Sequence, residues 1–337
     1  KKNLIKLKKL KQNNETRIGR GLIFHVTPSN VPTNFFYSLI FGLLSGNSNI
    51  VKVPSKKFIQ ISIISSIIEK LLKKRKYVKL KKMITIIGYK DDNNITKLIS
   101  ENCDTRIVWG GDKTINNIRE FSLKPHANEI TFSDRYSISV INTDKITYQN
   151  NNSNLIRLIQ NFYNDTMIMD QNACSSPHLI FWLGKNKKKL SELFWKNLSK
   201  KISKDYDFPD IASIDKYVKI CNDVTMKNFK SAKIYDKSLH VVKLKKLNFE
   251  LDTLRGKWGY FYEYNIQSLN EIIPCLNPKY QTLTYFGIQK NEIKDFINGN
   301  NPRGIDRVVP IGQSLHISLD WDGYDIIKSL SRGINII

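Results

Sequence analysis

The stretch GLIFHVTPSNVPTNFFYSLIFGLLSGNSNIVKV, residues 21–53, decides the fold of this chain. It opens with a short apolar run at residues 22–26 that is typical of a buried strand, followed by a turn of small residues and prolines at 27–32. Residues 35–44 then predict an apolar helix that ends at a Gly-Asn pair, and residues 49–53 predict the next strand. Two short apolar strands joined by a helix are the unit from which parallel sheets are built.

The alternation of strand and helix continues down the chain. The pattern predicts further helices at residues 57–72, 95–100 and 113–121, and further strands at residues 83–87, 106–109 and 136–141. We therefore expect an α/β protein in which a doubly wound parallel sheet is covered by helices on both faces. In such sheets, ligands bind where the carboxyl ends of the strands lead into helices. The loops in that place are residues 27–32, 53–56 and 109–113.

The stretch DQNACSSP at residues 170–177 places Cys174 in a turn between a helix and a strand. Apolar residues recur at helical spacing over 155–167, and residues 179–183 form a continuous apolar run that predicts a buried strand. A turn of small residues can present a thiol beside backbone N–H groups. A single cysteine is more often a small buried hydrophobe, so a chemical role for Cys174 depends on the rest of the chain.

The remaining segments carry weaker patterns. A polar stretch at residues 143–153 predicts a boundary between two domains, and residues 1–17 predict a peripheral helix or arm. A lysine-rich surface helix is expected at about 186–203, whereas residues 210–235 carry no clear pattern. The later strands are predicted at residues 240–244, 260–264, 282–286 and 308–311.

The bulk composition is that of a soluble globular protein. Of its 337 residues, 41% are hydrophobic and 25% are charged, which allows one large domain or two ordinary ones. The sequence contains no signal-peptide pattern and no apolar run long enough to span a bilayer. The four cysteines and five histidines are scattered without disulfide or metal-ligand spacing, which predicts a reducing, cytoplasmic location and no metal site.

The formal net charge of +24 has two interpretations. The charge could serve a polyanionic partner, such as nucleic acid, an anionic membrane surface or an acidic carrier protein. Alternatively, lysine is simply the ordinary solvated residue of this chain. The second interpretation is favoured, because the basic residues are spread along the sequence. No nucleic-acid motif accompanies them, so we expect no nucleic-acid partner.

Several stretches of the chain, taken in order, match the motifs of one superfamily. TPSNVP (27–32) is similar to a P-x-N-x-P loop, and GNSNIVKVPS (46–55) resembles a G-N-x-x-x-x-K-P-S segment. DQNACSSP (170–177) resembles the nucleophile loop of acyl-CoA reductases. The tail stretches at 281–287 (QTLTYFG) and 304–323 resemble segments of the same reductases. Together they resemble the aldehyde dehydrogenase superfamily and, within it, the acyl-CoA reductase (LuxC-type) branch. The likeness covers most of the chain beyond its N-terminal arm.

The resemblance implies an aldehyde-dehydrogenase-like architecture. It implies an NADP-binding cofactor domain with a doubly wound parallel sheet (residues 1–150) and an α/β catalytic domain (residues 151–300). A C-terminal return segment (residues 301–337) would pack on the cofactor domain or at an oligomer interface. The superfamily also implies a homo-oligomer, a dimer or larger.

The resemblance assigns roles to individual residues. Cys174 is the implied nucleophile, and Asn30 with the Cys174 backbone N–H is the implied oxyanion hole. Lys52 and Ser55 would hold the adenosine ribose, and the pair Gly110-Gly111 would let the backbone approach the cofactor diphosphate. The full set of implied cofactor-binding positions is Thr27, Pro28, Ser29, Lys52, Ser55, Lys56, Gly110 and Gly111.

The implied function is NADPH-dependent reduction of a long-chain fatty acyl thioester, carried by coenzyme A or an acyl carrier, to the fatty aldehyde. The residue chemistry agrees, because a cysteine takes an acyl group from a carrier thiol in a nearly isoenergetic exchange. Asn30 and a backbone N–H would face the oxygen that becomes negative, and a nicotinamide would supply the hydride. An acyl-transfer partner protein is also expected. Two alternatives stay open: reduction of an acyl phosphate, and a non-catalytic binding protein on this fold.

Some positions depart from the superfamily pattern. Where ordinary aldehyde dehydrogenases place the glutamate that activates water, this chain has Thr131, with Glu129 two residues away. A reductase that passes acyl groups between thiols needs no such base, although Glu129 as a displaced base stays open. Thr284 stands at the position of the glutamate that binds the cofactor ribose, and Ile115 replaces the second glycine of the diphosphate loop.

Cofactor choice can be argued from charge after the KVPS stretch. NAD-preferring members of the superfamily carry a glutamate there, which would repel the 2′-phosphate of NADP. This chain has Ser55-Lys56-Lys57 instead, which predicts NADPH rather than NADH. The alternative is that Lys56 and Lys57 are ordinary lysines at the start of a helix, where cations are mildly unfavourable.

Overall fold

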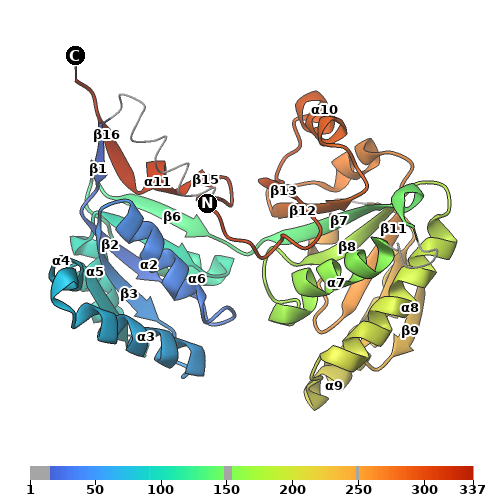
Figure 1. Ribbon diagram of the computed structural model, residues 1–337, viewed down its shortest axis with the longest axis horizontal. Coiled ribbons are helices and arrows are strands. Elements are labelled where there is room, and N and C mark those ends of the chain that lie inside the picture. Colours follow the sequence, from blue (N-terminus) through green and yellow to red (C-terminus); the bar gives the residue numbers. More distant parts are fainter. Residues whose placement is uncertain (1–15, 91, 148–153, 248–249, 337) are drawn as a thin grey trace. The chain divides into compact units, whose positions relative to one another are not determined.

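The structure is a computed structural model that describes residues 16–90, 92–147, 154–247 and 250–336. The chain forms two compact units: the first runs to Asp134 and resumes at Ile317, and the second comprises Arg135–His316 (Figure 1). Most of the arm predicted for residues 1–17 and part of the predicted polar boundary lie outside the described residues. Each unit contains its own β-sheet and its own core.

The first unit is built on a parallel sheet with the strand order β4-β3-β2-β5-β6. Its strands are β2 (Leu22–Val26), β3 (Ser48–Val53), β4 (Ile84–Gly88), β5 (Thr105–Trp109) and β6 (Asn128–Phe132). The chain starts in the middle at β2, adds β3 and β4 on one side, and then returns to add β5 and β6 on the other. The predicted doubly wound α/β fold is thereby confirmed, although the sequence did not predict β6.

Helices cover both faces of this first sheet (Figure 1). The helices that follow the strands are α2 (Asn34–Leu44), α3 (Ile59–Leu72), α5 (Asn93–Asn102) and α6 (Asp112–Arg119). Phe24 of β2 lies in one core cluster with Ile115 of α6, whereas its neighbour Ile23 lies in another with Phe41 of α2. Successive residues of a strand point to opposite faces, so burying both side chains requires helices on both sides.

A chain of buried polar side chains crosses the core of the first unit. Trp109 Nε1 donates to Ser38 Oγ (3.0 Å), which lies 2.7 Å from His25 Nδ1. His25 Nε2 lies 2.9 Å from Oδ1 of Asn49, whose Nδ2 donates to the Asn47 carbonyl (2.7 Å). Since the Asn49 amide donates through its nitrogen, its oxygen accepts the His25 Nε2–H, and the imidazole is neutral. These bonds fix β2, β3, β5 and α2 relative to one another.

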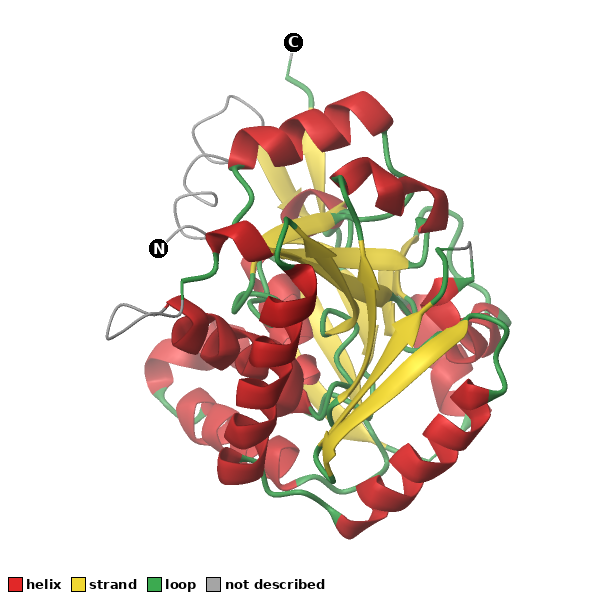
Figure 2. Ribbon diagram, turned by 90° about the vertical axis from the view of Figure 1, so that its right-hand side faces the viewer, coloured by secondary structure: helices red, strands yellow, loops and turns green. Residues whose placement is uncertain are grey.

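The second unit is built on a seven-stranded sheet with the order β13-β12-β7-β8-β11-β10-β9. Its strands are β7 (Tyr136–Asn142), β8 (Pro177–Leu183), β9 (Phe229–Asp236), β10 (Leu239–Leu244), β11 (Tyr260–Asn265), β12 (Tyr280–Phe286) and β13 (Arg307–Pro310). All neighbouring pairs are parallel except β9 and β10. α7 (Asn154–Thr166) and α8 (Lys187–Asp205) pack on one face, and α10 (Lys290–Asn300) packs on the other. Figure 2 shows helices on both sides of the strands.

The segment without a sequence pattern, residues 210–235, forms α9 (Asp210–Val224) and most of β9. β9 is an edge strand whose residues 230–234 are exposed. α9 buries only Ala212, Lys216 and Asp223, two of which are charged. The apolar side chains of α9, among them Ile211, Ile214 and Val218, are exposed, so they do not form a face buried in the core. Their spacing is helical, and the sequence-based prediction missed it.

The division between the units differs from the predicted domain boundaries at residues 150 and 300. β7 ends before residue 150, yet it lies between β12 and β8, so the chain enters the second unit at Arg135. From Ile317 onward the chain returns to the first unit, where Trp321 and Ile326 join its core. Polar composition marks a surface loop, whereas strand pairing decides the unit to which a strand belongs.

Three global features bear on function. Within the described part of the chain, no helix combines the length and the apolar character needed to cross a bilayer. All four cysteines are free thiols, of which Cys103 and Cys275 are buried, Cys221 is exposed and Cys174 lies between these extremes. Among the described residues, no group of three or more His, Cys, Asp or Glu side chains is arranged to hold a metal ion.

The buried His25 predicts an acid-sensitive first unit. Burial lowers its pKa to about 4, although the hydrogen bond to Asn49 acts in the opposite direction. In the unfolded chain, this histidine has an ordinary pKa of about 6.5, so between pH 6.5 and pH 4 it binds a proton that the folded chain does not bind. The free energy of unfolding is therefore highest above pH 6.5. It falls by about 3 kcal/mol as the pH is lowered to 4.

Hydrogen exchange of peptides from residues 22–53, followed against pH, measures this loss. The substitution His25→Asn should flatten the dependence between pH 6.5 and pH 4. The matched control His126→Asn, at an exposed position of the same unit, should leave it unchanged. An equally steep dependence in His25→Asn and the wild type would contradict the assignment.

Candidate active site

Cys174 lies in the loop that joins α7 to β8. A short 3-10 turn, Met167–Met169, extends α7, and Asp170 and Gln171 follow with φ angles of +53° and +60°. Left-handed backbone is uncommon for residues other than glycine and costs about 1–3 kcal/mol for each residue. Two such residues in succession, just before the cysteine, indicate that contacts with the surroundings impose the shape of this loop.

Three side chains hold the loop to neighbouring elements. Gln171 Nε2 donates to a backbone carbonyl at the start of β11 (3.0 Å). Ser176 Oγ donates to the carbonyl of Asp165 in α7 (2.7 Å), and Ser137 Oγ of β7 donates to the carbonyl of Cys174 itself (2.6 Å). The backbone on both sides of the thiol is therefore fixed to a helix and two strands.

The Cys174 thiol is half-buried and faces polar side chains from two further strands. Gln281 Nε2, near the start of β12, donates to Cys174 Sγ at 3.4 Å. Arg307 is the first residue of β13, the strand beside β12. Burial lowers the pKa of its guanidinium, and interactions with Asp165 and Cys174 oppose that effect. Gln281 and Arg307 thus stand at the amino ends of adjacent parallel strands, at the edge of the sheet where Cys174 precedes β8.

Sequence reasoning assigned no role to Gln281 or Arg307, although both lie in the tail stretches that carry the family resemblance. Their approach to Cys174 depends on β12 lying beside β7 and on β13 lying beside β12. The available signal was a polar residue at the first or second position of a strand within such a stretch.

His178, four residues after Cys174, is a neutral core side chain. It is fully buried in β8, and its ring stacks on Tyr136 with the ring centroids 5.4 Å apart. Burial, together with the charge of Arg255, lowers its pKa to about 3, against a hydrogen bond with the Gly256 backbone. A base with this pKa accepts a proton only in strong acid, so His178 does not ionise the thiol near neutral pH.

The predicted cofactor-binding residues of the first unit lie together at one edge of its sheet. Thr27, Lys52 and Gly110 stand at the carboxyl ends of the neighbouring strands β2, β3 and β5. Thr27 Oγ1 donates to the Lys52 carbonyl (2.8 Å), and Lys52 Nζ lies over the Tyr89 ring at 4.9 Å from its centroid. The other predicted positions follow in the same loops. Ser29, Ser55, Lys56 and Gly111 are exposed, and Pro28 is half-buried.

Gly111 leaves open space at the start of α6. It is the residue before the first turn of the helix, and a Cβ added to it would meet no atom within 4 Å. A Cβ on Gly110 would lie 3.1 Å from Thr114, so this glycine serves the packing of the loop on its own helix. Asp112 in the first turn of the helix is acidic and disfavours an anion there. The open backbone at Gly111 fits the approach of a cofactor phosphate.

Asn30, the predicted partner of Cys174 in an oxyanion hole, lies on the exposed loop after β2 in the first unit. Cys174 lies in the second unit. The two units are described separately, so a joint role of these two residues stays a prediction. Within the first unit, Asn30 shares its loop with Thr27 at the cofactor edge of the sheet.

Glu129 is engaged in two ion pairs. Its Oε2 accepts from Arg106 Nε (2.9 Å) and Nη2 (2.6 Å), and its Oε1 accepts from Arg119 Nε (2.7 Å). Arg106 is 2% exposed, so its charge depends on this carboxylate for compensation. Both carboxylate oxygens are occupied by guanidinium groups, and this geometry argues against Glu129 as a displaced water-activating residue.

Two other departures from the superfamily pattern are core positions. Thr284 is fully buried in β12, and its hydroxyl donates to the Ile138 carbonyl (3.5 Å). Ile115 packs in α6 against Phe24 and Val108. Threonine and isoleucine at these positions therefore serve packing within their own units.

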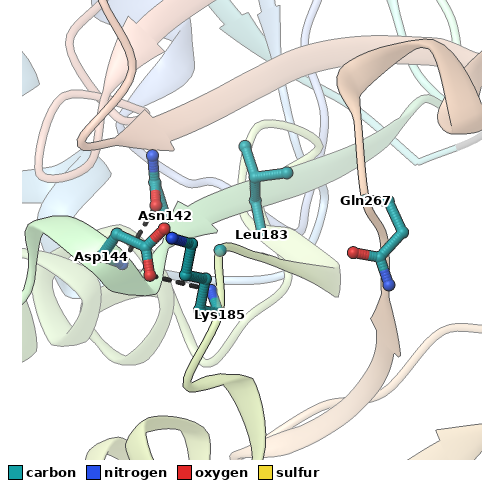
Figure 3. Close-up of a pocket in the computed structure, with 6 residues that line it drawn as sticks. Asn142, Asp144, Leu183, Lys185 and Gln267 are labelled. Atoms are coloured by element: carbon teal, nitrogen blue, oxygen red, sulfur yellow. Dashed lines mark hydrogen bonds between the residues drawn. The ribbon is translucent and has the colours of Figure 1, made fainter.

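The cavity drawn in Figure 3 lies at the other edge of the second sheet. It has a volume of about 280 Å³ and is lined by Asn142, Asp144, Leu183, Gly184, Lys185 and Gln267. Asn142 and Leu183 end β7 and β8, whereas Cys174 precedes β8. Asn142 Oδ1 accepts from the Asp144 N–H (3.0 Å), and Asp144 Oδ1 accepts from the Lys185 N–H (2.8 Å). The cavity lies at the opposite ends of the strands from the cysteine. Two of its lining side chains also bond outside it, since Asn142 Nδ2 donates to the Gly287 carbonyl (3.2 Å) and Gln267 Oε1 accepts from Lys187 Nζ (2.9 Å).

Comparison with known proteins gives a family match over nearly the whole chain. The family model described as acyl-CoA reductase (LuxC) matches residues 2–333. The long-chain acyl-protein thioester reductase of Aliivibrio fischeri is 24% identical over 168 residues, which are 50% of this chain and 33% of that protein. The Photorhabdus laumondii protein of the same name is 25% identical over 166 residues, 49% of this chain and 32% of its own. The matched segment spans about a third of the length of these relatives.

Solved structures share the fold at low sequence identity. Lactaldehyde dehydrogenase from Escherichia coli matches with a TM-score of 0.66 and 11% identity, covering 95% of this chain and 70% of that one. Staphylococcus aureus AldH in its substrate-bound state matches with a TM-score of 0.62 and 14% identity, covering 95% and 72%. Likeness at this level of identity shows the fold alone.

The fold is like that of solved aldehyde dehydrogenases. The chain belongs to the acyl-CoA reductase (LuxC) family. The family that the sequence motifs indicated is confirmed, and so is the aldehyde-dehydrogenase-like fold. The family implies a nicotinamide cofactor, and the open edge of the first sheet has residues that fit one.

The ion pairs of Glu129 give a test of its role. The substitution Glu129→Gln leaves the buried Arg106 without a counter-charge and should lower the free energy of unfolding of the first unit by roughly 3 kcal/mol. Acyl reduction per folded molecule should be unchanged. The free energy of unfolding is measured by urea unfolding, with hydrogen exchange of first-unit peptides as the readout. Acyl reduction is measured by turnover. Glu120→Gln, at an exposed position after α6, is the matched control. Loss of turnover with intact stability would instead identify Glu129 as a base.

Proposed function

We propose that this protein reduces a long-chain fatty acyl thioester to the fatty aldehyde, with NADPH as the reductant and Cys174 as the nucleophile. The observation that carries the proposal is the Cys174 loop, in which a half-buried thiol on an imposed backbone receives a hydrogen bond from Gln281. The family, together with relatives named long-chain acyl-protein thioester reductases, supports the substrate class.

The first step is transfer of the acyl group to the enzyme. Cys174 Sγ attacks the acyl carbonyl carbon, the bond from that carbon to the carrier sulfur breaks, and the carrier thiolate leaves. Exchange between two thioesters is nearly isoenergetic, so the step depends on positioning. Ser137 and Ser176 hold the loop that carries the sulfur. Asn30 and the Cys174 N–H are the proposed donors to the oxygen that becomes negative.

The second step is reduction of the acyl-enzyme. The nicotinamide cofactor, when bound, supplies the hydride that this step requires. We assign the cofactor to the edge of the first unit formed by Thr27, Lys52, Ser55 and Gly111, and the acyl group to the second unit. Breaking of the bond between the reduced carbon and Cys174 Sγ then releases the aldehyde and frees the thiol.

The absence of a free carboxylate near the superfamily's base position supports reduction over hydrolysis. Release of an acyl group as the acid requires a base that activates water, and Thr131 cannot serve as one. Glu129, the nearest carboxylate in sequence, is committed to Arg106 and Arg119. An acyl-enzyme formed on Cys174 would therefore react with hydride and not with water.

Cys174→Ala should abolish thioester-dependent oxidation of NADPH, by more than about a thousandfold, because no other group can hold the acyl chain. The measurement is NADPH absorbance with a series of acyl-CoA thioesters, and Cys221→Ala, at an exposed thiol, is the matched control. If acyl phosphates and not thioesters are turned over, the substrate class is wrong. If neither substrate is turned over by the wild type, the chain is a binding protein on this fold.

We propose NADPH as the preferred cofactor because Lys56 is exposed after β3 and no carboxylate stands beside it in sequence. Its ammonium lies over the Phe58 ring, 5.4 Å from the ring centroid, a weak contact that a 2′-phosphate can replace. A charge-assisted hydrogen bond of this kind contributes about 1.5–3 kcal/mol.

Lys56→Glu should therefore lower kcat/KM for NADPH by roughly ten- to a hundredfold and leave kcat/KM for NADH nearly unchanged. Steady-state kinetics with both cofactors measure the ratio. Lys79→Glu, at an exposed position of the same unit, makes the same change in net charge away from the proposed site. Equal or better efficiency of the wild type with NADH would refute the NADPH assignment.

A further inference from the structure

Arg307 is held in one orientation by a turn that follows its own strand. Its Nη1 donates to the Ser314 carbonyl (2.6 Å), and its Nη2 donates to the carbonyls of Gln313 (2.8 Å) and His316 (2.7 Å). Three backbone carbonyls on one guanidinium leave little rotational freedom, and neutral carbonyls do not cancel its charge. The positive charge is therefore fixed in place.

Asp165 connects this turn to the nucleophile loop. Its carboxylate accepts from the N–H groups of Gly312 (2.6 Å) and Ser314 (2.9 Å), so it shapes the turn that holds Arg307. Its own backbone carbonyl accepts from Ser176 Oγ, two residues after the cysteine. Asp165 is 1% exposed, and its charge also interacts with that of Arg307. One residue of α7 thus sets the positions of both the cation and the thiol.

The amide of Gln281 is oriented with its nitrogen towards the sulfur. Thr282 Oγ1 donates to Gln281 Oε1 (3.3 Å), which leaves Nε2 to donate to Cys174 Sγ (3.4 Å). Thr282 also pairs with Arg307 across β12 and β13, so the amide and the guanidinium are carried by adjacent strands. The donor to the sulfur and the fixed guanidinium are therefore carried side by side on β12 and β13.

We propose that Gln281 and Arg307 hold Cys174 in its thiolate form, Gln281 as a hydrogen-bond donor to the sulfur and Arg307 as a fixed positive charge. The proton of the thiol is released to solvent, and the nucleophile is prepared by charge without a general base. Gln281, which touches the reacting atom, is a catalytic residue, and Arg307 and Asp165 are positioning residues. The inference rests on the proposed function only for the identity of the nucleophile.

The surroundings of the loop favour this reading over a cysteine–histidine pair. The other titratable or charged groups in the loop and on the elements packed against it include Asp165, Asp170, His178, Arg255, Tyr136 and Tyr206. Asp170 accepts a hydrogen bond from the Tyr206 hydroxyl, and Tyr136 stacks on His178. Asp165 is already bonded to two backbone N–H groups, and His178 is a buried neutral ring. Arg255 adds a second positive charge on the side of His178. A cation next to a thiol favours its ionised form.

The test is alkylation of each cysteine by iodoacetamide as a function of pH, read by peptide mass spectrometry. Iodoacetamide is neutral, so surface charge does not change its encounter with the protein. Cys221 is exposed and serves as the internal reference in the same sample. In the wild type, Cys174 should reach half of its maximal rate at a lower pH than Cys221.

The substitution Arg307→Met should move the half-maximal pH of Cys174 upward by about one pH unit, and Arg307→Lys should move it less. Gln281→Glu places a carboxylate beside the sulfur and should also move it upward, while Gln281→Leu should give a smaller change. The Cys221 profile should stay constant in all four variants. Circular dichroism and the melting temperature show which variants are folded.

The proposal is overturned if the Cys174 profile of folded Gln281→Glu coincides with that of the wild type, whether or not Arg307→Met folds. It is equally overturned if wild-type Cys174 titrates with or above Cys221. Alkylation needs neither NADPH nor a thioester, so these results are independent of the proposed reduction. A shifted profile in a protein without reductase activity would retain the thiolate inference and reject the function.

Discussion

The position of β7 between β8 and β12 is the constraint on which the geometry around Cys174 depends. Parallel pairing aligns the amino ends of these strands and of β13, and it brings side chains from distant parts of the chain to one edge. Ser137 of β7 then reaches the Cys174 carbonyl, and Gln281 of β12 reaches its sulfur. A slip of β7 by one residue would turn Ser137 to the opposite face of the sheet and remove its contact.

Buried charge shapes both units, with different consequences for chemistry. In the first unit, Glu129 compensates the buried Arg106, which removes the carboxylate nearest in sequence to the superfamily's base position. In the second, Asp165 holds the turn that fixes the orientation of the Arg307 guanidinium. An unpaired buried ion is costly, so each carboxylate is committed to its partners. Both carboxylates therefore serve the structure of their own units.

Local sequence signals were sufficient for most of the first sheet. β2, β3 and β5 are short apolar runs bounded by turn residues, and their predicted limits agree with the structure to within one residue. The same signals were overlooked in α9, whose apolar stripe of Ile211, Ile214 and Val218 is exposed. They are weak in the edge strand β9, whose middle residues are exposed. They also missed β6, in which a glutamate and a threonine alternate with the buried Ile130 and Phe132.

By itself, the sequence determined the α/β class and the family and indicated Cys174 as the candidate nucleophile, because periodicity and contiguous motifs such as DQNACSSP are local properties of the chain. Only the tertiary structure decided that the second unit begins at Arg135, that Glu129 is held by two arginines, and which side chains face Cys174. Gln281 lies 107 positions from Cys174, and their contact exists only through the order of the strands. Strand order and the burial of charge depend on the whole unit, so no single stretch of sequence encodes them.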